Sequence, residues 1–257
     1  MKVIALILSL TTAAFSEVIE RDVEYQHKDT ALLGFHAYDT DTDGKRPGIL
    51  IVHQWTGLTD YEKRRARMLA ELGYNVFALD IYGKGIRPQP PASGKEAGKY
   101  KGNRKLFRER LHAGLDVLKG DSRTDPENIA AIGYCFGGTG VLELARSGAA
   151  IDGVVSFHGG LGAADGMAAR KGDIKASILV CHGAVDPHVS DEEVAGFQSE
   201  MSAAEADWQF IAYSDAVHAF TQPMAGDDPS KGAAYQKKAD ERSWRHMLDF
   251  FSELFEE

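Results

Sequence analysis

The chain has 257 residues, of which 44% are hydrophobic, and its formal net charge at pH 7 is −9. This size and composition suit one large globular domain and exclude a low-complexity chain. The acidic balance argues against nucleic acid as a partner. We find no internal repeat, and no apolar run is long enough to be a transmembrane helix of the mature chain.

The first twenty residues, MKVIALILSLTTAAFSEVIE, differ in character from the rest of the chain. One lysine precedes an apolar run of about a dozen residues, and small residues come next, which is typical of a secretory signal peptide. Ala14 and Ser16 stand where a signal peptidase would require them. We therefore expect residues 1–16 to be a signal peptide and residues 17–257 to form a single domain. The mature protein would be exported, periplasmic or secreted, with no membrane contact; the alternative is an ordinary N-terminal strand or buried segment.

The first strand–helix–strand unit is predicted from three consecutive patterns. Residues 48–53, GILIVH, form a continuous apolar run, as expected of a strand buried on both faces. Thr59 and Glu62 form a capping box at the start of a helix over 59–73. The next strand is expected over 74–82, YNVFALDIY. This order predicts a βαβ crossover with parallel strands.

Strands and helices continue to alternate along the rest of the chain. The stretch PQPPASGK at 88–95 predicts a loop that Pro and Gly keep irregular. Alternation of this kind means a mostly parallel central sheet with helices on both faces, the α/β class. Active sites in such sheets lie at the carboxyl ends of the strands. The other expected elements are an antiparallel strand pair at 18–26 and 31–39, strands at 128–135, 152–160, 176–183 and 208–214, helices at 104–118, 137–148 and 190–204, and a C-terminal helix with an apolar stripe of Trp244, Met247, Leu248, Phe251 and Phe255.

Cys135 lies among glycines in the stretch IGYCFGGTG. The stretch fits the pattern G-x-nucleophile-x-G-G, in which a tight strand-to-helix turn strains the backbone of the nucleophile and packs its neighbours closely. Cys135 would then project above the sheet at the start of a helix, whose dipole lowers the pKa of a thiol. The alternative is a buried structural cysteine followed by a glycine-rich cap.

Two further polar residues come directly after predicted core strands. Asp186 stands in CHGAVDPHVS, and His218 stands in SDAVHAF after the last strand. The chain order nucleophile, acid, histidine is that of the α/β-hydrolases. We therefore expect His218 to accept the proton of Cys135, and Asp186 to hold the tautomer and orientation of the imidazole.

These motifs resemble the dienelactone hydrolase family of the α/β-hydrolase superfamily. The resemblance implies a hydrolase of small carboxylic esters or lactones that needs no cofactor, with Cys135 as nucleophile, His218 as base and Asp186 as acid. It also implies an oxyanion hole formed by the backbone N–H groups of Phe136 and Trp55. It covers nearly all of the expected mature chain and rests on GILIVHQWTG, RARMLAELGYNVFALDIYGKG, IAAIGYCFGG, LVCHGAVDPHV and AVHAF.

Three positions in the expected substrate region depart from the family pattern. Gln54 replaces the usual glutamate; it can hydrogen-bond a thiol but cannot take its proton. The two arginines that bind a substrate carboxylate in the family correspond to Lys84 and to a position near Gln222. Lysine binds a carboxylate as a point charge, without the bidentate fork of arginine. These three residues are the substrate contacts that the resemblance implies.

The segment from 84 to 110 is strongly basic within an acidic chain. It holds nine lysines and arginines but only two acidic residues. Either this segment covers the mouth of the site and favours anionic substrates, or it is a solvated helix face. The second arrangement is the more common one for such a run.

Several other polar residues carry weaker signals. His53, His158, His182 and His188 fall at or near strand ends, but they lack ligand spacing such as H-x-x-x-H, so we expect no metal site. A non-catalytic or redox-responsive binding protein of the same fold remains the alternative function. The oligomeric state is left open.

The two cysteines are not expected to form a disulfide, even in an oxidising compartment. The strand at 152–160 should separate the strands that carry Cys135 and Cys181, which sets them about 9.6 Å apart. A disulfide requires Cα atoms within roughly 7 Å. Cys181 is therefore predicted to behave as a small buried hydrophobe.

Overall fold

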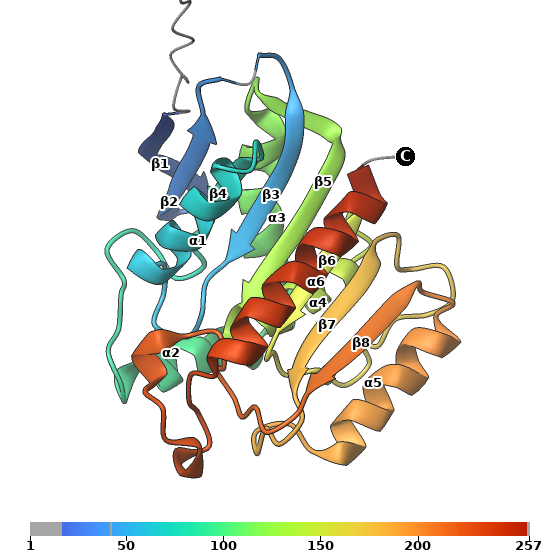
Figure 1. Ribbon diagram of the computed structural model, residues 1–257. Helices are drawn as coiled ribbons and strands as arrows, with labels where there is room; N and C mark the ends of the chain where they lie inside the picture. The colour runs from blue at the N-terminus through green and yellow to red at the C-terminus, as the bar shows by residue number, and fades with distance from the viewer. Residues whose placement is uncertain (1–16, 42, 256–257) are drawn as a thin grey trace, which may run out of the picture.

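The computed structural model describes residues 17–41 and 43–255, so the predicted signal peptide at 1–16 and its boundary lie outside the described residues. One eight-stranded sheet runs through the described ranges in the order β1-β2-β4-β3-β5-β6-β7-β8 (Figure 1). The strands are β1 (Val18–His27), β2 (Thr30–Asp39), β3 (Arg46–Val52), β4 (Asn75–Ala78), β5 (Thr124–Tyr134), β6 (Gly153–Phe157), β7 (Ser177–Gly183) and β8 (Trp208–Tyr213). The helices are α1 (Asp60–Ala70), α2 (Ala92–Lys101), α3 (Arg104–Gly120), α4 (Phe136–Arg146), α5 (Asp191–Ala203) and α6 (Lys237–Phe255).

The sheet is mostly parallel, as the alternation of strands and helices predicts. β3 to β8 pair in parallel, and only β2 runs antiparallel to its neighbours β1 and β4. The expected antiparallel pair at the N-terminus is therefore confirmed. This is the α/β-hydrolase fold, and it brings the carboxyl ends of β3 to β8 to one edge of the sheet.

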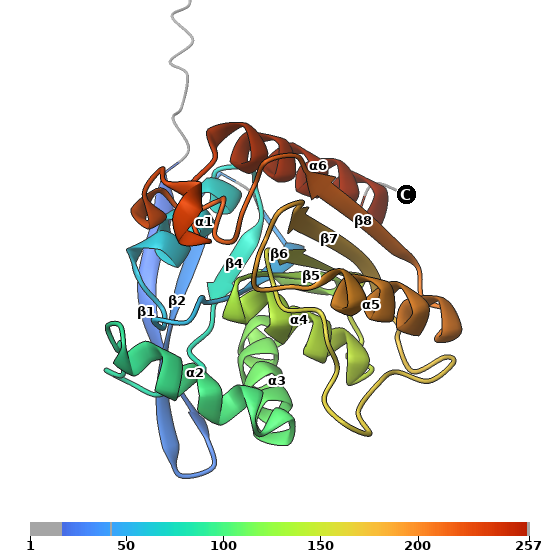
Figure 2. The ribbon, with the colours of Figure 1, turned by 90° about the horizontal axis from the view of Figure 1, so that it is seen from below.

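Helices cover both faces of the sheet and enclose two apolar cores. α1 and α6 lie on one face, and α3, α4 and α5 lie on the other (Figure 2). The core under α6 includes Met247 and Phe251, which are fully buried and belong to the stripe predicted from the sequence. The core on the other face includes Phe107 of α3 and Phe136 of α4. Because both faces are covered, the central strands consist almost entirely of buried residues.

α2 corrects one sequence-based expectation. The sequence predicts an irregular loop throughout 88–95, but a helix begins at Ala92, directly after Pro91. Proline is tolerated at a helix start because it lacks only an N–H that has no intrahelical partner there. Ser93, Ala97 and Tyr100 are buried and share one face of α2, so tertiary packing stabilises a helix that contains two glycines.

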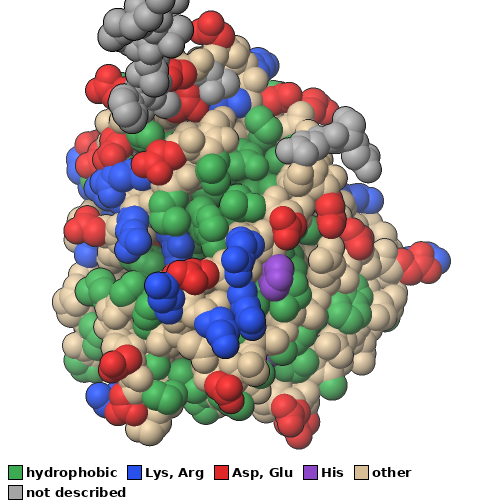
Figure 3. Space-filling model, viewed as in Figure 1, with side chains coloured by type: hydrophobic (Ala, Val, Ile, Leu, Met, Phe, Trp, Pro, Cys, Tyr) green, Lys and Arg blue, Asp and Glu red, His purple; other side chains and the backbone are tan. Residues whose placement is uncertain are grey.

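The face of the molecule in Figure 3 is mixed in charge. On the face in Figure 3, basic and acidic side chains are interspersed with hydrophobic ones, which is the pattern of an ordinary solvated surface. Within the described ranges, no helix has the length and apolar character needed to cross a membrane.

Candidate active site

Cys135 occupies the sharp turn between β5 and α4. Its φ angle is +55°, a strained value for a residue with a side chain. A Cβ atom on Gly133 would lie 2.0 Å from the carbonyl oxygen of Gly137, and one on Gly137 would lie 2.1 Å from that of Val52. Only glycine fits at these two positions. The glycines of the motif therefore allow α4 to start directly above the sheet, with Cys135 at its N-terminus.

The structure brings Cys135, His218 and Asp186 together at the carboxyl edge of the sheet. Cys135 Sγ lies 3.0 Å from His218 Nε2, and His218 Nδ1 lies 2.8 Å from Asp186 Oδ2. Asp186 is also fixed by the backbone N–H of His188, which donates to its Oδ1 at 2.9 Å. Asp186 is buried, whereas Cys135 and His218 are partly exposed. The three residues thus form a connected chain that opens toward solvent at the thiol.

The electrostatics of these groups favour a thiolate–imidazolium pair. Burial raises the pKa of Cys135, but the charge and hydrogen bond of His218, the charge of Lys101 and the N–H of Phe136 together leave that pKa below its ordinary value. Burial lowers the pKa of His218, but Cys135 and Asp186 outweigh it and raise that pKa to about 10. The pKa of Asp186 is lowered, because its contact with His218 outweighs burial. Both shifts therefore favour an anionic sulfur beside a cationic imidazole.

The two predicted oxyanion donors come from different elements of the fold. Phe136 is the first residue of α4, where backbone N–H groups lack intrahelical acceptors. Trp55 lies in the loop after β3, and its carbonyl oxygen accepts a hydrogen bond of 2.9 Å from the Tyr82 hydroxyl. Tyr82 in turn stacks on Tyr100 of α2. The unpredicted helix α2 therefore helps to hold the loop that carries Trp55.

Glu62 has a second role that its capping box did not reveal. Its side chain is fully buried, and its carboxylate accepts hydrogen bonds from Thr59 N at 2.8 Å and from Gln54 N at 3.1 Å. The Gln54 side chain donates to Thr56 Oγ1 instead of contacting the thiol. Glu62 thus joins the start of α1 to the loop that carries Trp55. The sequence contained the residue, but only the fold brings it to this loop.

The other two predicted substrate contacts, Lys84 and Gln222, differ in their position relative to the site. Lys84 forms an ion pair with Glu24 of β1, and no described contact joins it to the three residues at the sheet edge. Gln222 lies in the same loop as His218, and its Nε2 is buried without a hydrogen-bond acceptor among the described residues. Lys101, at the end of α2, has no ion pair within the described ranges and acts electrostatically on Cys135. The sequence indicated the basic segment, but the lysine that acts on the thiol is Lys101 and not Lys84.

Five of the nine basic residues in this segment form ion pairs with acidic residues. Glu143 of α4 is fully buried and lies within 4.0 Å of both Arg104 and Arg108. A solvated, ion-paired surface therefore describes most of this segment better than a continuous positive field. The remaining pairs are Lys84 with Glu24, Arg87 with Asp80, and Lys99 with Glu96.

The histidines near the strand ends pack around the site without forming a metal centre. Among the residues that the structure describes, no group of three or more His, Cys, Asp or Glu side chains could hold a metal ion. His53 is buried, and burial lowers its pKa to about 4. His158 and His188 lie 5.3 Å and 5.0 Å from the His218 ring, centroid to centroid. His182 packs on an aromatic ring of β8.

Cys181 lies in β7, separated from Cys135 by the intervening strand β6, as the sequence predicts. Both cysteines are free. Cys181 is fully buried, and burial raises the pKa of its thiol to about 12. Cys181 is therefore the less reactive of the two thiols.

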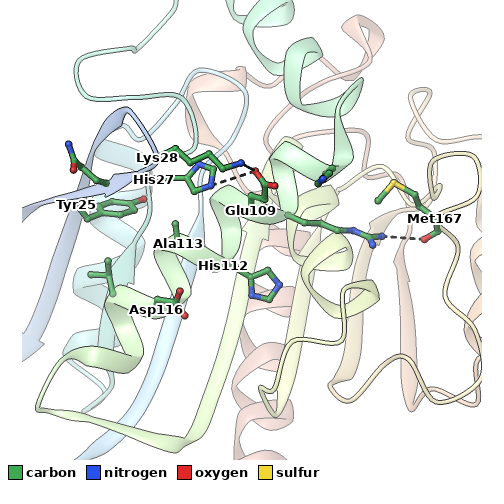
Figure 4. A pocket seen from close by; sticks show the side chains of 12 residues that line it. Tyr25, His27, Lys28, Glu109, His112, Ala113, Asp116 and Met167 are labelled. Carbon is green, nitrogen blue, oxygen red and sulfur yellow. Dashed lines mark hydrogen bonds and ion pairs between the residues drawn. The ribbon is translucent and has the colours of Figure 1, made fainter.

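A separate groove of about 1090 Å³ lies between β1 and α3 (Figure 4). Lys28 and Glu109 form a 2.6 Å ion pair across it, with the His27 ring beside them, and Arg108 donates to the Met167 carbonyl at its other end. None of the site residues predicted from the sequence lines this groove. Lys28, Glu109 and Arg108 already have partners there, and we assign no chemistry to the groove.

Comparison with known proteins identifies the family. The model of the dienelactone hydrolase family matches residues 33–255. An uncharacterized protein of Caenorhabditis elegans, K02A2.1, is 38% identical over 152 residues, which are 58% of this chain and 94% of that protein. A protein of Escherichia coli K12 with the provisional name carboxymethylenebutenolidase is 27% identical over 85% of this chain and 81% of its own length.

Solved structures agree with this result. P91, a dienelactone hydrolase-like promiscuous phosphotriesterase from metagenomic libraries, is 40% identical and superposes with a TM-score of 0.87, covering 92% of this chain and 98% of its own. The structure named m3DLH is 37% identical, with a TM-score of 0.88 over 93% of this chain and 99% of its own. The chain belongs to the dienelactone hydrolase family, within the α/β-hydrolases.

Proposed function

We propose that this protein hydrolyses small carboxylic esters or lactones through an acyl-thioester on Cys135. The observation that carries the proposal is the connected geometry of the three residues, with 3.0 Å from Cys135 Sγ to His218 Nε2 and 2.8 Å from His218 Nδ1 to Asp186 Oδ2. Membership of a hydrolase family supports it. The proposed mechanism uses only side chains and amides of this chain, with no cofactor.

In the first half-reaction, the thiolate of Cys135 attacks the carbonyl carbon and forms a C–S bond. The carbonyl π electrons move to oxygen, and the N–H groups of Phe136 and Trp55 stabilise the resulting oxyanion; each such donor typically contributes roughly 3–4 kcal/mol. When the oxyanion collapses, the C–O bond of the ester breaks. The leaving alkoxide takes the proton from Nε2 of His218, whose pKa of about 10 keeps that proton available at neutral pH.

In the second half-reaction, water attacks the thioester. His218 is now neutral and takes the proton of that water, while Asp186 stabilises the imidazolium that forms. Collapse of the second tetrahedral intermediate breaks the C–S bond, releases the carboxylic acid and regenerates the thiolate–imidazolium pair. The pair therefore returns to its starting protonation state after each turnover.

Substrates that carry a negative charge are the favoured class in this proposal. Lys101 supplies the charge, because it lies within electrostatic reach of Cys135 and has no acidic partner among the described residues. Gln222, with its unsatisfied buried amide, is the second candidate contact. The carboxylate or a similar anionic group of the substrate would lie between α2 and the loop after β8.

Hydrolysis of phosphotriesters is a second candidate activity. The similarity to P91, at 40% identity over nearly the whole chain, favours testing it. The same thiolate would attack phosphorus, form an S–P bond and expel an alkoxide or aryloxide, which His218 would protonate. Attack by water would then release the phosphodiester.

A panel of neutral and carboxylated aryl esters, small lactones and one aryl phosphotriester tests both candidates with the purified protein. We expect ester or lactone hydrolysis by the wild type and none by a Cys135→Ala variant. Hydrolysis of the phosphotriester alone would favour the second candidate. Turnover of none of these compounds, together with an unreactive Cys135, would favour the non-catalytic binding protein.

A further inference from the structure

A buried histidine lies beneath the nucleophile turn. His158 comes directly after β6, is fully buried, and has a φ angle of +40°, which is strained for a residue with a side chain. Its Nδ1 accepts a hydrogen bond of 3.2 Å from the backbone N–H of Cys135, which also donates to the Phe157 carbonyl at 3.0 Å. The proposed hydrolytic steps do not use this residue, so its position needs a separate explanation.

The protonation state of His158 follows from its partners. A backbone N–H can only donate, so Nδ1 of His158 must be unprotonated and the ring proton must lie on Nε2. Nε2 lies 2.8 Å from Thr221 Oγ1 and therefore donates to it. The titratable or charged groups around the ring include His218, Arg65 and His182, all basic. Burial, followed by the charge of His218, lowers the pKa of His158 well below its ordinary value.

The chain of hydrogen bonds continues beyond Thr221. Thr221 Oγ1 accepts the hydrogen bond from His158 Nε2–H and donates its own hydroxyl hydrogen to the Tyr61 hydroxyl at 2.7 Å. The Tyr61 hydroxyl donates to the Thr221 carbonyl at 3.2 Å and accepts from Arg65 Nε at 3.3 Å. Apart from the backbone N–H of Cys135, which two acceptors share, each proton that links these groups then has one acceptor. The arrangement requires neutral His158 with its proton on Nε2.

The chain links the two halves of the site. Cys135 belongs to the β5–α4 turn, whereas Thr221 lies three residues after His218 in the loop that follows β8. We propose that His158 is a positioning residue: by bridging the Cys135 backbone and the Thr221 hydroxyl, it holds the His218 loop at the distance that forms the Cys135–His218 contact. This inference rests on the proposed function for its catalytic meaning. Its structural part concerns the thiol itself and can be measured without any substrate.

The substitution Thr221→Val tests the inference, because it removes the hydroxyl and preserves the shape of the side chain. We expect kcat for a hydrolysed ester to fall about tenfold or more with little change in KM, since small misplacements of reacting groups are costly. We also expect the pH at which iodoacetamide half-maximally alkylates Cys135 to rise. Thr221→Ser keeps the hydroxyl and should restore both readouts to near the wild-type values.

Thr124→Val is the matched control. Thr124 is equally buried, and its hydroxyl accepts from Asn75 and donates to the Leu118 carbonyl, away from the site. It should lower thermal stability and leave kcat and the alkylation profile unchanged. If Thr221→Val has the wild-type alkylation profile, or if Thr124→Val shifts it equally, the positioning role is wrong. If the wild type hydrolyses no ester, the proposed function fails, and the alkylation profiles still decide this inference.

Discussion

The two cysteines of this chain lie two strands apart in one sheet, yet their thiols differ in chemistry. Burial raises the pKa of both. At Cys181, inside β7, burial prevails and the pKa rises to about 12. At Cys135, beyond the end of β5, burial is outweighed by the charge of His218 and its hydrogen bond, and the pKa falls below its ordinary value.

The difference shows what the carboxyl edge of the sheet adds to a buried position. A strand interior supplies only backbone and apolar contacts, with a tyrosine hydroxyl 3.5 Å from Cys181 Sγ. The strand ends supply loops that bring a histidine, a carboxylate and a helix N-terminus to one sulfur. The reactivity of a thiol therefore depends on the groups that surround it as well as on its burial.

Replacing each cysteine by alanine should give the largest difference between the two positions. Cys135→Ala should lower ester hydrolysis at least ~10³-fold, because the nucleophile is removed. Cys181→Ala should keep the kcat of the wild type and lose about 1 kcal/mol of stability, measured by denaturant unfolding. In thiol titration, the native wild type should show one fast-reacting thiol and the denatured protein two. Full turnover by Cys135→Ala would contradict the assignment.

The substitution His218→Asn should raise the pKa of the Cys135 thiol toward that of Cys181. In the wild type, His218 lowers the pKa of Cys135, so the alkylation rate should fall only as the pH drops through that lowered value. Without His218, only the charge of Lys101 and the N–H of Phe136 oppose the effect of burial, so the pKa of Cys135 should rise and the profile should move to higher pH. The rate at neutral pH should then fall about tenfold for each unit of that shift.

His188→Asn is the control, because its ring lies 5.0 Å from His218 and makes no described contact with the thiol. An unshifted alkylation profile in His218→Asn would mean that other groups stabilise the thiolate.

In the wild type, ester hydrolysis should persist toward high pH and decline near the His218 pKa of about 10, where the proton for the leaving group is lost.

Glu62→Gln tests whether the loop after β3 depends on the buried carboxylate. The amide would direct an N–H group at one of the backbone donors of Gln54 or Thr59, so the Trp55 loop should shift. We expect kcat to fall about tenfold with KM little changed. Thr59→Ala removes the helix cap but keeps the Gln54–Glu62 contact, so it should cost about 1 kcal/mol of stability with kcat retained. Equal kcat losses in both variants would assign Glu62 to the helix alone.

Lys101→Gln should give the smallest effect. An exposed charge contributes little, so KM for a carboxylated ester should rise about fivefold or less, and KM for a neutral ester should not change. Added salt should have the same selective effect on the wild type. Lys84→Gln is the matched control and should change neither KM. Equal effects of both lysine variants would leave the basic segment without a role in substrate choice.

The sequence predicted the parallel strands and the places of Cys135, Asp186 and His218 after them, because apolar runs and glycine spacing are local signals. α2 escaped prediction, since Pro91 and two glycines obscure a helix that tertiary packing stabilises. The contact of His158 with Thr221 joins residues 63 positions apart. Such contacts leave no local pattern. For the same reason the lysine that acts on the thiol could not be chosen from spacing alone.

The most direct test of the central claim is to trap the acyl group. The wild type is mixed with an activated aryl acetate, quenched in acid within the first turnover, digested and analysed by mass spectrometry. We predict an acetyl group on the peptide that contains Cys135, attached to its sulfur and removed by hydroxylamine. Rapid ester hydrolysis with acetyl found on another residue, or equal hydrolysis after alkylation of Cys135, would contradict the claim.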